Sequence, residues 1–140
     1  MSQDVPQEIV DHIMNLNKKT PYHRLLDMNI TSLAKGFCEA KLTVSDKHIN
    51  PIQMTHGGVA FSILDLVSGN AARTLSRETA TIEMNINYLA PSYTGDELVA
   101  QGRILKQGKR VIVAEGKLYK NEEVVAISRQ SMINLGDLLS

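Results

Sequence analysis

The fold is decided by residues 55–67, which read Thr-His-Gly-Gly-Val-Ala-Phe-Ser-Ile-Leu-Asp-Leu-Val. Gly57 and Gly58 open this segment, and the run that follows is apolar on nearly every side, as in a helix that is buried all round. Its single charge is Asp65, and an ionised carboxylate in an apolar helix is costly unless it is paired or hydrogen-bonded. We therefore expect a buried helix from residue 57 to about residue 75, in which Asp65 either faces a polar cleft or marks a less buried side.

The rest of the chain predicts strands around this helix. Several segments alternate apolar and polar residues, as strands do when they bury one face. Short turns join most of them, which favours hairpins and an antiparallel sheet. Small residues at alternate positions of two strands would let the sheet approach the helix: Ala100, Gly102, Ala114 and Gly116. The pattern predicts an α+β fold with strands at residues 28–33, 37–44, 81–88, 97–106, 111–119 and 124–133.

Two further segments complete the prediction. Apolar residues at helical spacing indicate a surface helix over residues 5–16, with Asp4 as its cap and Pro6 in its first turn. A short helical turn is expected over residues 22–27. The polar tail from residue 134 should be loose.

The composition excludes several classes of protein. A length of 140 residues suits one domain, so residues 1–140 are interpreted as a single domain. Fifteen basic and fifteen acidic side chains give a formal net charge of zero, which argues against a nucleic-acid partner. No apolar stretch reaches the ~20 residues of a membrane span. With a single cysteine, Cys38, and no visible secretory signal, a reduced cytoplasmic setting is the simpler interpretation.

The start of the central helix is the first candidate site. A helix N-terminus offers free backbone N–H groups and a partial positive charge, and Gly57 and Gly58 leave those groups unshielded. Such a site can hold an anion, or a carbonyl oxygen that becomes one during a reaction. The alternative is that the glycines only allow a tight turn from loop to helix, and the local sequence does not decide between the two.

Asp65 is the second candidate, and its distance from Gly57 limits how the two groups could act together. Eight helical residues separate their backbones by roughly 12 Å along the axis, which is too far for both groups to reach one carbonyl. If the two cooperate, Asp65 must meet the helix N-terminus of another chain. The alternative is a hydrogen-bonded structural carboxylate.

Two other groups of residues are candidate binding sites. His48, Asn50 and His56 precede the helix and, with Asp65, could suggest a metal site, but their spacing matches none of the common zinc patterns, so no metal is expected. The predicted hairpin at residues 106–110 carries Lys106, Lys109 and Arg110. Such a cluster is either a solvated turn or a grip for a phosphorylated ligand.

These residues together resemble a known family. Asn50, the His56-Gly57-Gly58 triplet and Asp65 are spaced as in the hotdog-fold acyl-CoA thioesterases of the phenylacetate-pathway (PaaI-like) group. The resemblance continues through residues 84–91 and 104–109 and covers residues 50–133. The strand order predicted above agrees with the hotdog fold, an antiparallel sheet wrapped around one long helix.

The resemblance implies a role for each residue of the motif. The Gly57 N–H would polarise the thioester carbonyl, and Asp65 of the partner subunit would act as nucleophile or as general base for water. Asn50 would help to hold the thioester or the water. His56 would lie near the leaving sulfur, and Thr81 would orient the carboxylate or the water.

The same resemblance implies where coenzyme A would bind. Pantetheine and the CoA phosphates would be held by the residues after the helix start and the third strand, together with the basic hairpin: Gly58, Tyr88, Leu89, Ala90, Pro91, Lys106, Lys109 and Arg110. CoA would be part of the substrate, so no separate cofactor is expected. The chain departs from the family at Gln53, where many relatives have glycine, and at Pro51, so the loop before the helix should differ in shape.

The sequence thus predicts an enzyme that hydrolyses an acyl-CoA or aroyl-CoA thioester to the free acid and CoA. It would act as a homodimer or homotetramer. The alternative from another class is a non-catalytic acyl-CoA-binding domain of the same fold, a sensor or regulator, against which the presence of Asp65 argues. A hydratase-type lyase of this fold is a third option, but its usual Asp and His motif is not found.

Overall fold

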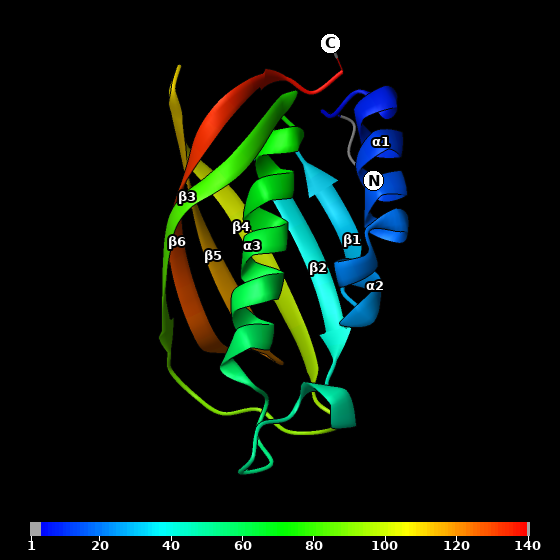
Figure 1. Ribbon diagram of the computed structural model, residues 1–140, viewed down its shortest axis with the longest axis vertical. Coiled ribbons are helices and arrows are strands. Elements are labelled where there is room, and N and C mark those ends of the chain that lie inside the picture. Colours follow the sequence, from blue (N-terminus) through cyan, green and yellow to red (C-terminus); the bar gives the residue numbers. More distant parts are fainter. Residues whose placement is uncertain (1–3, 140) are drawn as a thin grey trace.

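The computed structural model describes residues 4–139, in which one antiparallel sheet curves around a central helix (Figure 1). The strands are β1 (Asn29–Ala34), β2 (Phe37–Thr43), β3 (Arg77–Tyr88), β4 (Glu97–Gln107), β5 (Val111–Lys120) and β6 (Glu123–Asp137), in the spatial order β1-β2-β4-β5-β6-β3. The helices are α1 (Gln7–Lys19), α2 (Pro21–Leu25) and α3 (Gly57–Arg73), with a 3-10 turn at Asp46–His48. The predicted α+β architecture with an additional N-terminal helix is confirmed.

Helix α3 packs directly against β4 and β5 because these strands carry small residues where they cross it. Ala100 and Ala114 are fully buried. A Cβ atom added to Gly102 would lie only 2.5 Å from the carbonyl carbon of Val67, and one added to Gly116 would lie 2.5 Å from Ser128 Oγ on β6 and 2.9 Å from a methyl carbon of Leu64. The close approach of the α3 backbone therefore requires glycine at position 102, whereas position 116 is crowded by side chains of β6 and α3.

Replacing Gly102 by alanine should destabilise the fold. The added methyl group meets backbone atoms of α3, which cannot move aside as a flexible side chain can, and overpacking of this kind costs about 1–3 kcal/mol. Urea unfolding should show the loss. Gly69→Ala, on α3 itself, is the matched control, since its methyl group meets no atom within 4 Å and should leave stability equal or higher. Equal stability of the two variants would contradict the close packing.

The expectation that α3 is buried on all sides is wrong. The side away from the sheet remains partly uncovered along one stripe, made of Gly58, Phe61, Ser62, Asp65 and Gly69. Phe61 is 38% exposed, although its neighbours Ala60 and Ile63 are buried. Asp65 belongs to this stripe, so the chain does not bury a lone charge, and a large aromatic side chain lies beside it without cover.

The two edges of the sheet differ. Strand β1 is accompanied by α1, whose buried Asn17 donates to the Met28 carbonyl and accepts from the Ile30 N–H, at 3.0 and 2.9 Å. Strand β3 pairs with β6 on one side and, within residues 4–139, with no strand on the other. Ile82 and Tyr88 on β3 are 59% and 53% exposed. A long open edge with exposed apolar side chains is a ready template for pairing with another chain.

The strand alternation predicted for β3 is interrupted. Thr81 pairs with Met132, but the next paired residue is Glu83, opposite Ser131, so Ile82 is an extra, bulged residue. The bulge shifts the phase, and Thr81 turns toward α3 while Ile82 remains exposed. The strict alternation of faces expected for a strand at residues 81–88 is therefore wrong at this position, because Ile82 does not share the face of Met84.

Several element ends also differ from the prediction. Helix α1 runs from Gln7 to Lys19 and is capped by Pro6 without a side-chain bond, so Asp4 is not its cap. The tail is not loose, because β6 extends to Asp137, where it pairs with Arg77 at the start of β3, and the two side chains form an ion pair at 2.8 Å. None of the described helices is long and apolar enough to cross a membrane.

Candidate active site

The loop before α3 is organised by Asn50. Its Oδ1 atom accepts from the N–H groups of Ile52 and Met54, both at 3.0 Å, so the carbonyl end of this amide is committed to the loop. Gln53 holds a left-handed conformation, with φ of +68°, which glycine adopts without strain. Gln53 thus adopts a backbone conformation that favours glycine, and only the Nδ2 end of Asn50 remains for a ligand.

The two histidines of this loop have different tasks. His48 is fully buried, and its ring accepts from the Ser45 N–H at 2.9 Å and contacts the Leu26 carbonyl at 2.8 Å. Since both ring nitrogens are used, His48 is a structural residue. His56 is exposed and caps α3, its Nδ1 accepting from the Gly58 N–H at 2.8 Å. Its Nε2 side remains available to a ligand.

Gly57 is the first residue of α3, and Tyr88 lies against it. The Tyr88 hydroxyl donates to the Gly57 carbonyl at 2.7 Å, and a Cβ atom on Gly57 would come within 3.0 Å of that hydroxyl oxygen. Burial raises the pKa of Tyr88, so the phenol remains a donor. Within residues 4–139 no acceptor is bonded to the Gly57 N–H. The helix therefore presents a free N–H beside an aromatic ring.

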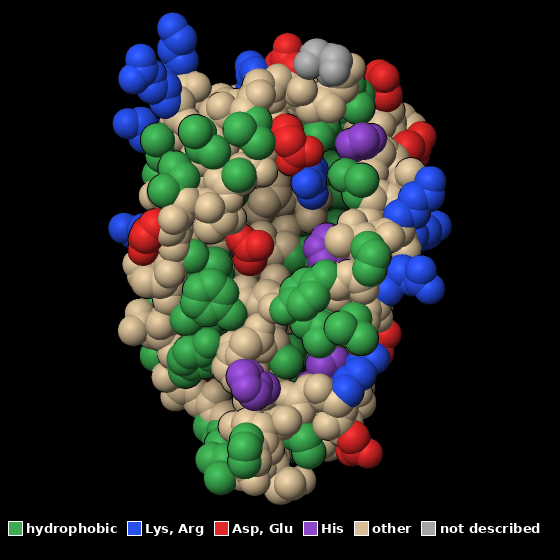
Figure 2. Space-filling model, in the orientation of Figure 1, with side chains coloured by type: hydrophobic (Ala, Val, Ile, Leu, Met, Phe, Trp, Pro, Cys, Tyr) green, Lys and Arg blue, Asp and Glu red, His purple; other side chains and the backbone are tan. Residues whose placement is uncertain are grey.

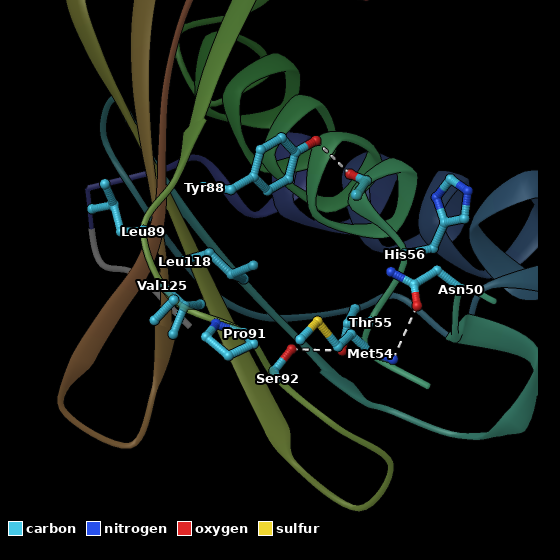
Figure 3. Close-up of a pocket in the computed structure, with 12 residues that line it drawn as sticks. Asn50, Met54, Thr55, His56, Tyr88, Leu89, Pro91, Ser92, Leu118 and Val125 are labelled. Carbon is cyan, nitrogen blue, oxygen red and sulfur yellow. Dashed lines mark hydrogen bonds between the residues drawn. The ribbon is translucent and has the colours of Figure 1, made fainter. Parts of the chain in front are cut away.

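A cavity of about 490 Å³ opens at this helix start (Figure 3). One wall comes from the loop and the helix start, with Asn50, His56 and Gly57, and the other from the segment after β3 and from strands β5 and β6. The predicted binding residues Tyr88, Leu89, Ala90 and Pro91 all line it. Its shape and apolar lining suit a long, flexible ligand that passes the free Gly57 N–H.

Asp65 is held by two neighbours from different strands. Thr81 Oγ1 on β3 donates to Asp65 Oδ1 at 2.8 Å, and Gln130 Nε2 on β6 donates to the same oxygen at 3.0 Å. The bulge at Ile82 is what turns Thr81 toward the carboxylate. The structure therefore brings the predicted Thr81 to Asp65 and adds a residue, Gln130, that the sequence interpretation did not name.

A second cavity, of about 250 Å³, lies at Asp65. Helix α2 forms one wall with Tyr22 and His23, and the exposed stripe of α3 forms another. The Tyr22 hydroxyl bonds the Ser62 hydroxyl at 2.6 Å, which fixes α2 to α3. Burial, and then the positive charge of Arg73, lowers the pKa of His23 against the opposing effect of Asp65, so His23 is neutral at neutral pH.

Within one protomer the two candidate groups serve different cavities. Gly57 lines the first cavity and Asp65 the second, and the two linings share no residue. Their separation of roughly 12 Å along α3 follows from the helix itself. A single chain therefore does not assemble the site that the resemblance implies.

The remaining predicted residues lie elsewhere. Gly58 is exposed, and its N–H is already bonded to His56, so it does not line the first cavity. Lys106, Lys109 and Arg110 are exposed at the β4–β5 hairpin, where Figure 2 shows basic side chains gathered at the upper left. The start of α3 lies at the opposite end of the molecule (Figure 1). In one chain, the basic hairpin is therefore remote from Gly57.

No metal centre emerges from the described residues. Between residues 4 and 139, no group of three or more His, Cys, Asp or Glu side chains is placed to hold a metal ion. Burial raises the pKa of the Cys38 thiol, which is fully enclosed in the core and does not face either cavity.

The sequence interpretation missed Gln130, Tyr22 and His23. A signal for Gln130 existed, because it occupies an inward position of β6 between Ser128 and Met132, where a buried polar side chain requires a partner. Tyr22 and His23 gave no such signal, since their place against α3 depends on how the chain folds back at residue 20.

Comparison with known sequences identifies the family. The sequence profile of the thioesterase superfamily matches residues 53–127, more than half of the chain. Acyl-coenzyme A thioesterase 13 of Mus musculus is 33% identical over 108 residues, which cover 73% of this chain and 76% of the mouse protein. A putative esterase of Archaeoglobus fulgidus is 29% identical over 93 residues, covering 66% of this chain but only 60% of that relative's length.

Solved structures show the same architecture. The Escherichia coli PaaI protein, from the phenylacetic acid degradation operon, superposes with a TM-score of 0.89 over 96% of this chain and 98% of that one, at 23% identity. A Streptococcus mutans protein solved bound to acetyl CoA superposes with a TM-score of 0.76, at 27% identity, over 79% of this chain and 90% of that one. With its motif, its strand order and its central helix, the chain belongs to the thioesterase superfamily and has the hotdog fold.

Proposed function

We propose that the protein is an acyl-CoA thioesterase whose active site is completed by a second copy of the chain. The observation that carries this proposal is the division of the two reacting groups between separate cavities of one protomer. The relatives named as acyl-coenzyme A thioesterases support the reaction, and the S. mutans structure with acetyl CoA supports a CoA ligand.

The dimer would form through the open edge of β3. Two copies of β3 can pair antiparallel across a two-fold axis, since the edge is 12 residues long and is not covered by a described element. Along this strand, Thr81 is hydrogen-bonded to Asp65 and Tyr88 is hydrogen-bonded to Gly57. These two strand residues therefore give the positions of Asp65 and Gly57 along β3. An axis near Met84 and Asn85, midway between them, would place Asp65 of each chain opposite the helix start of the other.

The chemistry of this shared site follows from its groups. The thioester carbonyl oxygen would accept from the Gly57 N–H, which stabilises the negative charge that develops on it. Asp65 of the partner would either attack the carbonyl carbon or deprotonate a water molecule that attacks it. If water attacks, the thiolate of CoA leaves near His56 and the acid forms directly; if Asp65 attacks, the thiolate leaves behind an acyl–Asp65 anhydride, which a water molecule then hydrolyses to the acid and the free carboxylate. His56 Nε2 and Asn50 Nδ2 are the donors left free by the loop geometry.

Coenzyme A would lie along the first cavity. Its pantetheine arm would pass the Tyr88–Pro91 wall to reach Gly57, and the acyl group would continue toward the partner's Asp65 cavity. Because β3 pairs antiparallel, the partner's β4–β5 hairpin would lie at the end of the molecule where this chain's α3 begins. The basic cluster would then serve the site of the partner rather than that of its own chain.

The proposal is tested by a hydrolysis screen over a panel of CoA thioesters with aliphatic, branched and aromatic acyl groups. Release of free thiol is monitored, and at least one thioester should be turned over with kcat/KM in the ordinary enzyme range of ~10⁴ M⁻¹s⁻¹ or above. Tight binding of acyl-CoA without turnover of any member would instead indicate a non-catalytic acyl-CoA-binding domain.

The basic hairpin should make substrate affinity depend on salt. The nucleotide end of CoA is strongly anionic, the chain has no net charge to attract it, and exposed charges act weakly and are screened by ions. We expect KM for acyl-CoA to rise with ionic strength, with little change in kcat. The double variant Lys109→Ala, Arg110→Ala should raise KM and flatten this dependence.

A pantetheine thioester without the nucleotide is the control, since it should respond neither to salt nor to the double variant. Lys18→Ala together with Lys19→Ala, at the end of α1, removes the same charge from a surface that lines neither reaction cavity. If the hairpin variant keeps the parental KM at low salt, the phosphates are held elsewhere and the hairpin is only a solvated turn.

A further inference from the structure

Three side chains from three elements form a closed ring of hydrogen bonds around the Asp65 carboxylate. Gln130 Nε2 lies 3.0 Å from Asp65 Oδ1 and 3.2 Å from Thr81 Oγ1, and Thr81 Oγ1 lies 2.8 Å from Asp65 Oδ1. An amide nitrogen only donates, so the Thr81 hydroxyl accepts from Gln130. Its own hydrogen is then free to go to Asp65. Every polar hydrogen of the ring thus has one assigned acceptor.

The ring distinguishes the two oxygens of Asp65. Both donors meet Oδ1, and no hydrogen bond from residues 4–139 reaches Oδ2. Two donors on one carboxylate oxygen fix the plane of the group and hold its charge in place. Oδ2 is the oxygen left free to react.

Gln130 has features that a merely structural amide would not need. It is fully buried on β6, an internal strand of the sheet, and its Oε1 atom has no hydrogen-bond partner among the described residues. A buried carbonyl without a partner is costly, and an apolar side chain would avoid that cost. The unpartnered Oε1 of Gln130 therefore lowers folding stability, while its Nε2 amide group donates to Asp65.

We propose that Gln130 is the positioning residue of the reaction, holding the Asp65 carboxylate so that Oδ2 faces the thioester. This inference rests on the proposed function. Thr81 sits on the edge strand β3 beside a bulge, so its position depends on the pairing of that edge. Gln130 is anchored within the sheet and binds both partners, and it therefore ties the carboxylate to the rigid part of the fold.

The test compares Gln130→Met with Ser128→Ala in the full-length protein. Methionine keeps the length and volume of glutamine but removes both donated bonds. Losing a hydrogen bond to a charged group should lower kcat about 10- to 100-fold, while KM stays within about two-fold of the parent. Ser128 faces inward on the same strand, two residues away, and its hydroxyl has no hydrogen-bond partner among residues 4–139, so Ser128→Ala should keep parental kcat. Gln130→Leu replaces the methionine variant if that chain does not fold.

A second comparison separates positioning from stability. If Gln130 acts through Asp65, adding Gln130→Met to Asp65→Asn should lower kcat no further than Asp65→Asn alone. A crystal structure of Gln130→Met should also show the Asp65 carboxylate turned away from its parental orientation, and this readout does not require activity.

The outcomes separate this inference from the proposed function. A parent that hydrolyses no CoA thioester overturns the function, and the crystal structure then decides whether Gln130 still orients Asp65. An active parent with normal kcat in Gln130→Met, or a further loss in the double variant, overturns the positioning role while the thioesterase function stands.

Discussion

Replacing Asp65 by asparagine should lower kcat for acyl-CoA hydrolysis by at least ~10², the smaller end of what a lost acid–base group costs. Asparagine matches aspartate in shape, and its Oδ1 can still accept from Thr81 and Gln130, so the surrounding contacts persist. It lacks the charged oxygen that would attack the carbonyl or take a proton from water. We therefore expect KM to change little, and the defect to appear in the chemical step.

Glu122→Gln is the control for this variant, because it removes an exposed carboxylate from the β5–β6 turn, which lines neither reaction cavity. Steady-state kinetics on the best thioester of the panel provide the measurement. Near-normal turnover by Asp65→Asn would mean that the carboxylate is only a hydrogen-bonded structural group.

Gly57→Pro should lower kcat by a similar factor, but for a different reason. Proline fits the first position of a helix, and His56 before it is already extended, with ψ of 136°, as a residue before proline must be. The substitution therefore removes the Gly57 N–H while leaving α3 in place. Loss of one donor to a developing oxyanion costs about 10²–10³ in kcat.

The steric effect of proline must be separated from the loss of its N–H. Any side chain at this position meets the Tyr88 hydroxyl at about 3.0 Å, so Gly57→Ala has the same contact but retains the donor. The ratio of the two kcat values isolates the contribution of the N–H. If the alanine and proline variants are equally impaired, Gly57 is required for space and not for its hydrogen bond.

The fold was predictable because the strongest signals in the chain are local. The apolar run beginning at Val59 predicted the central helix, and small residues such as Gly102 on β4 predicted its close contact with the sheet. Element ends were less predictable, since they depend on pairing between distant segments. Residues 134–137 are mostly polar and read as a loose tail, yet they form a strand because β3 lies beside them.

The candidate site was predictable only for the residues that belong to a recognisable sequence motif. The His56-Gly57 helix start and Asp65 stand out in the sequence, and Thr81 was placed through the family resemblance. The bulge at Ile82, which turns Thr81 toward Asp65, depends on the register between β3 and β6 and has no signature in either strand alone. The same holds for His23, whose place beside Asp65 is set by the packing of α2.

A single chain leaves one side of α3 incompletely buried. A helix this apolar was expected to be buried all round, but Phe61 and Asp65 lie on a partly exposed stripe beside the open edge of β3. We interpret both features in the same way. In the proposed dimer the partner chain would cover this stripe, and the protomer would then supply only part of the burial that the apolar pattern predicts.

The shared site is tested most directly by mixing two inactive chains. Gly57→Pro lacks the N–H donor but keeps Asp65, whereas Asp65→Ala lacks the carboxylate but keeps the donor. A heterodimer of the two contains one site with both defects and one site with neither. The two chains are tagged differently, unfolded and refolded together, and the heterodimer is isolated by sequential affinity steps. We predict about half of the parental kcat per dimer, while each homodimer remains inactive. Heterodimers that form correctly but show no activity would contradict a site built from Gly57 of one chain and Asp65 of the other.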